Sequence, residues 1–165
     1  MHEFETERLK MRLLQKEDKD FFVSLYTDPK IMRHIAEPFT TEKTISLFNS
    51  AIKLNLKFPL RQLLWVIVEK KTGDICGIQN LSMHYEDNLE AEAGLILSRS
   101  AQGKFYPEEA LVGMVDYAFN ILKLKTTFAY SSIQNRASKR VVLKAGFKEI
   151  HVDGNKVSYK KVSPF

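Results

Sequence analysis

The loop from Gln102 to Tyr106 is the segment whose residue types and position best fit a chemical role. It contains Gly103 and Lys104, and residues 107–110 directly after it open a long amphipathic helix. Backbone N–H groups of such a loop converge above the helix N-terminus, where the helix dipole favours negative charge. The sequence therefore predicts an anion-binding site at this loop.

Polar residues that could complete the same site lie about thirty positions further along the chain. Asn135 and Ser138 come shortly before residues 144–147, which read Lys-Ala-Gly-Phe. The side-chain amide of Asn135 can both donate and accept hydrogen bonds. Gly146 predicts the end of a short helix, because glycine readily adopts the left-handed conformation that follows many last helical turns.

Hydrophobic periodicity predicts the elements that must hold these residues in place. Apolar stretches with strand spacing and apolar stripes with helical spacing indicate seven strands and four helices. The strands are expected at residues 9–13, 63–69, 75–83, 90–97, 126–130, 147–150 and 157–160. The helices are expected at residues 17–26, 41–56, 107–122 and 135–145. This order predicts an α+β (mixed α/β) fold in which helices cover a twisted sheet and the strands beside the third helix are parallel.

Three positions predict local features of these elements. Asp28 and Pro29 are expected to break the first helix. Thr40 or Thr41 is expected to cap the second helix. Gly94, inside a strand, indicates either a bulge or a close approach of another part of the chain.

Size and composition favour a single globular domain over residues 1–165. Apolar residues make up 44% of the chain and charged residues 27%, an ordinary globular balance. The longest apolar run has six residues, which is too short to span a bilayer. Cys76 is the only cysteine, so a reducing cytoplasm is the simplest location. No cluster of Cys and His has the spacing of a metal site, so no metal is expected.

Four pieces of the sequence, in this order, resemble the GNAT superfamily of acetyl-CoA-dependent N-acetyltransferases. They are residues 7–12, residues 92–97, residues 102–104 with Glu109 and Ala110, and residues 135–138 with 144–147. The closer resemblance is to the branch that acetylates the N-terminal alanine or serine of ribosomal proteins. It implies a GNAT-like fold with a mixed sheet of about six to seven strands, about four helices, and acetyl-CoA in a cleft between two central parallel strands.

The resemblance also implies which residues bind the cofactor. The N–H groups from Gln102 to Tyr106, including those of Gly103, Lys104 and Phe105, would hold the pyrophosphate of acetyl-CoA. The pantetheine arm would pair with the strand backbone near Leu95 and Leu97, as an added strand does. Asn135 and Ser138 would complete the cofactor contacts.

Acetyl transfer requires a neutral amine and a proton for the departing thiolate. Glu92 matches a glutamate often found in the family and is the first candidate for the base, with Glu90 on the same strand face in reserve. Ser138 matches a family serine near the thiol and is the first candidate for the acid, with Tyr130 as the alternative. A solvated strand carboxylate remains open for Glu92, as does a local helix hydrogen bond for Ser138.

The acceptor stays open at the level of sequence: a protein N-terminus, a polyamine, a drug amine and a small metabolite all fit. His84 and Tyr85 end a strand where the family receives its amine, although a surface position explains a lone histidine equally well. A monomer and a homodimer are both compatible with the sequence, and no membrane partner is expected.

Two further function classes are compatible with parts of the sequence. Phe105 stands where the family usually has glycine, and Pro107 stands where it usually has glycine or alanine. These two departures suggest a GNAT-fold acyl-CoA-binding or regulatory module with impaired catalysis. The net charge is −1 over residues 1–100 and +6 over residues 101–165. That basic part would attract a polyanionic ligand and also allows a nucleic-acid-binding protein, although no recognised nucleic-acid motif is present.

Overall fold

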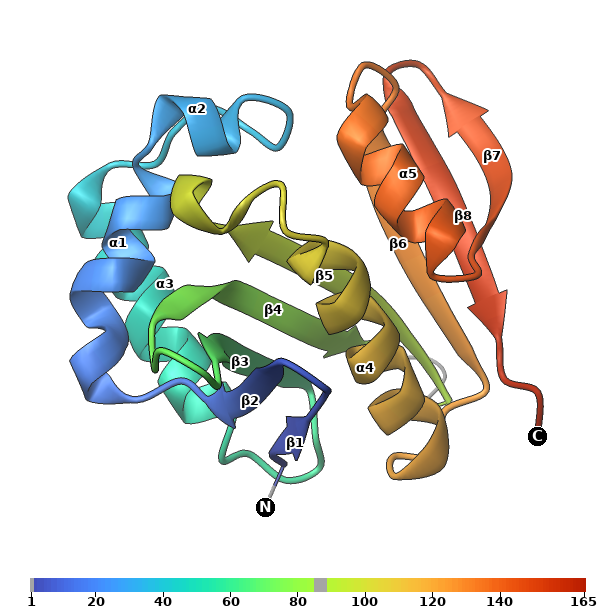
Figure 1. The fold of residues 1–165 in the computed structure, drawn as a ribbon, viewed down its shortest axis with the longest axis horizontal. Helices are drawn as coiled ribbons and strands as arrows, with labels where there is room; N and C mark the ends of the chain where they lie inside the picture. The colour runs from blue at the N-terminus through green and yellow to red at the C-terminus, as the bar shows by residue number, and fades with distance from the viewer. Residues whose placement is uncertain (1, 85–88) are drawn as a thin grey trace.

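The computed structural model describes residues 2–84 and 89–165. These residues form one eight-stranded sheet with the order β1-β2-β3-β4-β5-β6-β8-β7 (Figure 1). The strands are β1 (Phe4–Glu5), β2 (Leu9–Leu13), β3 (Gln62–Glu69), β4 (Ile75–Met83), β5 (Glu90–Leu97), β6 (Thr126–Ser132), β7 (Lys148–Asp153) and β8 (Lys156–Val162). The helices are α1 (Lys19–Tyr26), α2 (Pro29–Met32), α3 (Thr41–Leu54), α4 (Tyr106–Asn120) and α5 (Arg136–Lys144), with short 3₁₀ turns η1 (Lys16–Asp18) and η2 (Arg99–Ala101).

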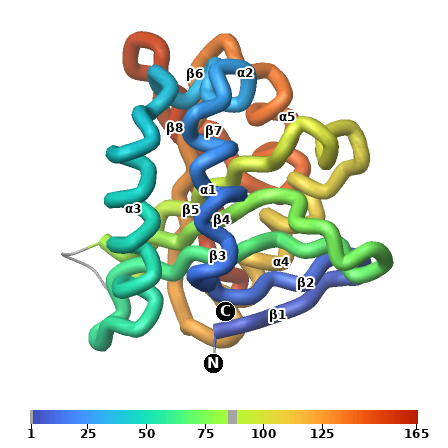
Figure 2. Tube along the Cα trace, turned by 90° about the vertical axis from the view of Figure 1, so that its left-hand side faces the viewer, coloured from blue at the N-terminus to red at the C-terminus, as the bar shows by residue number. Residues whose placement is uncertain are grey.

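Helices cover both faces of the sheet. Helices α1 and α3 lie on one face, as the turned view shows, while α4 and α5 lie on the other (Figures 1 and 2). The α1–α3 side buries an apolar cluster that includes Phe22, Phe48 and Val66. The α4–α5 side buries a larger cluster that includes Trp65, fully buried in β3, and Met114 of α4. The sheet is thus held between two apolar layers, which is what makes its central strands a rigid support for a site.

The GNAT-like fold predicted from the sequence is confirmed, with one strand and one helix more than the expected numbers. The additional strand β1 has two residues, too few for an alternating pattern to show. The additional helix α2 is a single turn that begins at Pro29. Its cap is Asp28, whose carboxylate accepts from the N–H of Lys30 at 2.8 Å. Asp28 and Pro29 therefore end α1 and also start a new helix, because proline is well suited to the first helical position.

Most local predictions agree with the structure. Thr40 caps α3, and its hydroxyl oxygen accepts from the N–H of Lys43 at 3.2 Å. Gly94 marks a close approach: a Cβ there would lie 2.4 Å from Oδ1 of Asn80 on the neighbouring strand. The pairing of β4 with β5 continues through Gly94 without a register shift, so the alternative interpretation, a β-bulge at this position, is wrong. Gly146 follows α5 with a φ of +93°. Tyr85 lies outside the described residues.

Candidate active site

The strands β5 and β6 part from each other in the middle of the sheet. They pair in parallel only from Glu90–Glu92 to Thr126–Phe128, and beyond that point they diverge (Figure 1). A cleft of about 1400 Å³ occupies the opening. The sequence-predicted site residues that line it are Glu92, Leu95, Leu97, Gln102, Gly103, Phe105, Tyr130, Asn135 and Ser138. Residues far apart in the sequence therefore meet at one cavity.

The backbone of β5 presents unused hydrogen-bonding groups to this cleft. Hydrogen bonds to β4 involve the even-numbered residues of β5, because the N–H of Ser98 donates to Cys76 and the N–H of His84 donates to Glu90. Bonding alternates along an antiparallel strand pair, so the N–H and C=O groups of Leu95 and Leu97 point the other way, toward the opening. Since β6 has already diverged, these groups are available to an extended ligand.

Strand β6 forms the opposite wall of the cleft, and its backbone hydrogen bonds alternate in the same way. The odd-numbered residues of β6 bond to β8, as the 2.7 Å hydrogen bond from the N–H of Ile133 to the C=O of Asn155 shows. The main-chain groups of Tyr130 and Ser132 consequently face the cleft. Both walls of the opening thus carry peptide donors and acceptors.

The predicted anion loop follows β5 and ends at the N-terminus of α4. Gly103 and Phe105 both have left-handed backbone conformations, with φ values of +81° and +60°. The N–H of Gln102 already donates to the C=O of Arg99. Four of the five expected N–H groups, those of residues 103–106, have no partner among the described residues and remain available for an anion.

Phe105 and Pro107 occupy their positions without disrupting the loop. Phe105 takes up the left-handed conformation that glycine adopts freely, and its ring is 63% exposed, with Nζ of Lys144 5.0 Å from the ring centre. Pro107 is the second residue of α4, where an N–H makes no bond within the helix. The loop loses one donor at Pro107 but keeps its position above the helix.

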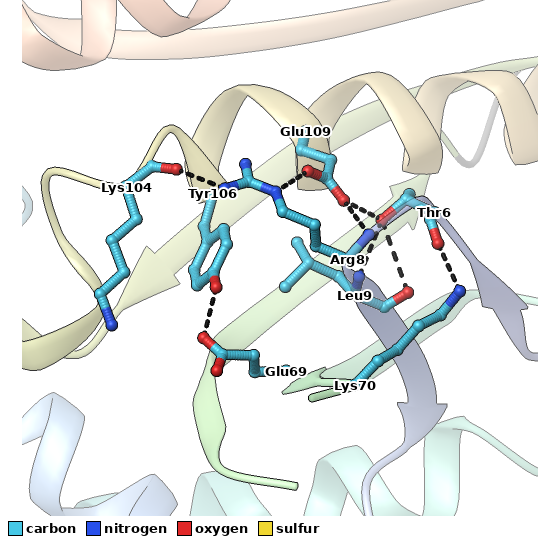
Figure 3. Close-up of polar contacts among 8 residues, drawn as sticks. All are labelled: Thr6, Arg8, Leu9, Glu69, Lys70, Lys104, Tyr106 and Glu109. Atoms are coloured by element: carbon cyan, nitrogen blue, oxygen red, sulfur yellow. Dashed lines mark hydrogen bonds and ion pairs between the residues drawn. The ribbon is translucent and has the colours of Figure 1, made fainter. Parts of the chain in front are cut away.

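The side chains of Lys104 and Tyr106 point away from the cleft and do not line it. The buried ring of Tyr106 carries a hydroxyl that donates to the carboxylate of Glu69 on β3 (Figure 3). Nζ of Lys104 lies 5.8 Å from the centre of that ring. Any contact of these two residues with a ligand in the cleft would therefore come from their main chain.

Asn135 and Ser138 lie on the other wall, at the start of α5. Oδ1 of Asn135 caps the helix by accepting from the N–H of Ser138 at 3.0 Å. The amide NH₂ of Asn135 has no partner in the described part of the chain, so it is the half of the side chain that can bind a ligand. The hydrogen bond of Ser138 at this helix position involves its main chain, which leaves the hydroxyl at the cleft surface.

Glu92 and Tyr130 lie on the same face of the sheet, at the point where the strands diverge. Glu92 pairs with Phe128, and Tyr130 follows two residues later on the same face. Partial burial raises the pKa of the Tyr130 phenol, and the negative charge of Glu92 raises it further. Nζ of Lys156 lies 4.1 Å from the centre of the Tyr130 ring. Tyr130 therefore keeps its proton at neutral pH.

Glu90, the reserve base, has different surroundings. Its carboxylate lies 3.6 Å from Nδ1 of His84, whose ring stacks on Phe128 at a centroid distance of 5.3 Å. Neither Glu90 nor His84 lines the cleft. Among the described residues, no group of three His, Cys, Asp or Glu side chains could hold a metal ion.

One rim of the cleft was not predicted from the sequence. Residues 30, 31 and 33–35, in α2 and the segment after it, line the cleft opposite α5. Arg99 holds this rim in place, because its Nε lies 3.3 Å from the carboxylate of Asp28, the cap of α2. The one available sequence signal is the Asp28-Pro29 pair, which predicts a break in the first helix but not the helix that follows it.

The sequence matches the family described as an acetyltransferase (GNAT) domain over residues 8–148. This match covers most of the chain, so the chain belongs to the GNAT acetyltransferase family. It is an acetyl-CoA-dependent N-acetyltransferase, and the alternative of a module with impaired catalysis finds no support in these similarities.

Individual relatives agree with the family. An uncharacterized N-acetyltransferase p20 of Bacillus licheniformis is 27% identical over 146 residues, which are 87% of this chain and 81% of that protein. The spermidine N-acetyltransferase of Vibrio cholerae, in complex with CoA and spermine, has a TM-score of 0.80 at 20% identity, covering 94% of this chain and 96% of that one. A ribosomal L7/L12 α-N-protein acetyltransferase in complex with CoA has a TM-score of 0.80 at 15% identity, covering 96% of each chain. The last two share the fold with this chain.

No helix in the described ranges is long and apolar enough to cross a membrane.

The left-handed conformation of Phe105 can be tested by substitution. A left-handed residue with a Cβ costs about 1 kcal/mol more than glycine. We therefore expect Phe105→Gly to have a higher free energy of unfolding than Phe105→Ala by about 1 kcal/mol, measured in urea. Both variants remove the exposed ring, so Ala serves as the matched control. At an ordinary helix or strand position the order is reversed, and finding the alanine variant more stable would contradict the loop geometry.

Proposed function

We propose that the protein transfers an acetyl group from acetyl-CoA directly to a primary amine, with both substrates bound together in the cleft between β5 and β6. The observation that carries this proposal is the unpaired edge of β5, which leads directly to the loop of free N–H groups at the start of α4. An extended arm and a polyanionic group joined end to end fit these two features.

The cofactor would lie along β5. Its pyrophosphate would accept hydrogen bonds from the N–H groups of residues 103–106, at the positive end of the fifteen-residue helix α4. Its pantetheine amides would pair with the main chain of Leu95 and Leu97 and with the amide of Asn135. Leu97 and Glu92 are five residues apart, about 16 Å at about 3.3 Å per strand residue, so the thioester would reach the point of divergence.

The transfer step requires a base and an acid on either side of the thioester. Glu92 would take the ammonium proton of the acceptor, directly or through water, so that the neutral amine attacks the thioester carbon. A C–N bond then forms and the C–S bond breaks; the nitrogen releases its second proton to solvent as it becomes an amide, and the thiolate takes a proton. We assign the donation to Tyr130, held protonated by burial and by the charge of Glu92, or to Ser138, both of which line the cleft.

The acceptor is a primary amine of a protein N-terminus or of a small molecule. The two structural neighbours named above are described as acting on spermidine and on a ribosomal protein, so amines of both kinds are accepted by this fold. We place the reaction in the cytoplasm and in a monomer or homodimer, with the single buried Cys76 suited to a reducing compartment.

Calorimetric titration with acetyl-CoA, followed by thiol release with a panel of amines, tests the proposed function. We expect saturable binding and thiol release that depends on the added amine. The panel includes spermidine, short peptides with a free N-terminus and the same peptides with a blocked N-terminus as controls. An absence of heat at millimolar acetyl-CoA would contradict the proposal.

Glu92→Gln should lower kcat/KM by about 100-fold at neutral pH, because a general base contributes about 10²–10⁴-fold. The deficit should shrink as the pH approaches the pKa of the acceptor amine, where the amine loses its proton without help. Glu90→Gln is the matched control on the same strand face and should have a small effect. A deficit that is equal at every pH would exclude Glu92 as the base.

Tyr130→Phe should lower kcat more than Ser138→Ala, with KM for acetyl-CoA nearly unchanged. The reason is that Tyr130 lies on the same face as Glu92 near the point of divergence, whereas Ser138 belongs to the first turn of α5. Phenylalanine keeps the ring over which Lys156 lies, so the comparison isolates the hydroxyl. The opposite order would assign the proton donation to Ser138.

A further inference from the structure

A polar cluster lies next to the anion loop (Figure 3), and its members Arg8 and Glu109 do not line the cleft. At its centre is Arg8, in the turn between β1 and β2. Nε of Arg8 donates to Oε1 of Glu109 at 2.7 Å, and the N–H of Arg8 donates to Oε2 at 2.8 Å. Nη1 of Arg8 donates to the C=O of Lys104, inside the loop, at 3.0 Å. Arg8 therefore joins the chain start to the loop and to the first turns of α4.

The bond to the carbonyl of Lys104 fixes the direction of a peptide group. In a trans peptide the C=O of one residue and the N–H of the next point in opposite directions within one plane. Arg8 holds the C=O of Lys104 on the side away from the cleft. The N–H of Phe105, a residue that lines the cleft, is consequently aimed toward the space where an anion would bind.

Glu109 prevents the guanidinium of Arg8 from moving elsewhere. Its carboxylate, only 18% exposed, also accepts from the hydroxyl of Thr6 at 2.5 Å. Burial alone would raise the pKa of Glu109, but the hydrogen bonds from Thr6 and from Arg8 outweigh that effect and hold the pKa below its ordinary value. The carboxylate is thus charged at neutral pH and pairs with Arg8.

The guanidinium of Arg8 packs over the ring of Tyr106. Cζ of Arg8 lies 4.5 Å from the ring centre, and the ring is fixed by the bond from its hydroxyl to Glu69. The turn that carries Arg8 is itself attached to the turn that follows β3, because Nζ of Lys70 donates to the C=O of Thr6 at 2.6 Å. The side chain of Arg8 thus connects the anion loop with helix α4, and its neighbours Thr6 and Tyr106 connect the cluster with the end of β3.

We propose that Arg8 is a positioning residue for the cofactor: it aims the N–H of Phe105 at the pyrophosphate without touching the cofactor itself. The inference rests on the proposed function. Arg8 does not line the cleft, and its guanidinium is occupied by a carboxylate and a carbonyl, so it is not a phosphate ligand. Its importance comes from the geometry that it imposes on the loop.

The test uses two acetyl donors in turn and measures transfer to one acceptor, the amine that the unmodified protein acetylates fastest. Acetyl-CoA carries the pyrophosphate, whereas S-acetylpantetheine has the same thioester and arm without it. For Arg8→Ala we expect kcat/KM with acetyl-CoA to fall about tenfold or more through KM, since one hydrogen bond to a charged group is misdirected. With S-acetylpantetheine the variant should stay within about twofold of the unmodified protein.

Arg8→Lys gives a second, milder variant in case Arg8→Ala fails to fold. Lysine can pair with Glu109 but lacks the planar fork needed to hold the carbonyl of Lys104 at the same time. It should show the same selective loss with acetyl-CoA. Arg12→Ala is the matched control: Arg12 is also on the N-terminal strands and forms two 2.8 Å bonds to a carboxylate, that of Asp18, but it has no contact with the loop.

The outcomes separate this inference from the proposed function. A loss that is equal with both donors, no loss, or an equal selective loss in Arg12→Ala would overturn the positioning role. If no amine is acetylated by the unmodified protein, the proposed function fails, and calorimetry with CoA then decides on Arg8. Weaker CoA binding in both Arg8 variants but not in Arg12→Ala supports the positioning role, and unchanged binding overturns it.

Discussion

The parting of β5 from β6 after three residue pairs is the constraint on which the rest of the site depends. Two parallel strands in the middle of a sheet normally satisfy each other's backbone groups along their whole length. Here the ladder stops at Glu92 and Phe128, and the groups beyond it have no strand to pair with. An unsatisfied edge inside a covered sheet is costly unless water or a ligand meets it, and this is why we propose the opening as the binding site.

The two faces of the sheet carry different parts of the proposed site. The face covered by α4 and α5 carries the loop and the helix N-terminus that suit a polyanion, and the opposite face carries Glu92 and Tyr130. Gly94, which lies between these regions on β5, has no room for a side chain because Asn80 lies against it.

The sequence predicted the fold well because its signals are local and periodic. Helix α4 has an apolar stripe over four turns, and the β3–β4 hairpin has two apolar strands joined by a Gly-containing turn. The sequence did not predict α2 and β1, since neither is long enough to show a period. The element that closes one rim of the cleft was missed for that reason.

The sequence predicted which residues lie near the site but not how their side chains and peptide groups are oriented. Sequence spacing identified the loop of residues 102–106, and the structure shows that the side chains of Lys104 and Tyr106 do not line the cleft. The partners that settle this, Arg8 and Glu69, are 96 and 37 residues from the groups they bind. No local pattern contains such information, because a hydrogen bond across the fold depends on tertiary packing.

The attachment of the loop to the chain start also has a consequence for how the protein reaches its folded state. Closing a contact between Arg8 and residues almost a hundred positions later costs about 3 kcal/mol more chain entropy than closing a hairpin turn. The hairpins of the sheet and the turns of α4 can form early, from neighbours in sequence. We therefore expect the anion loop to acquire its final shape only after the first strand has docked, and the competence for catalysis to appear late in folding.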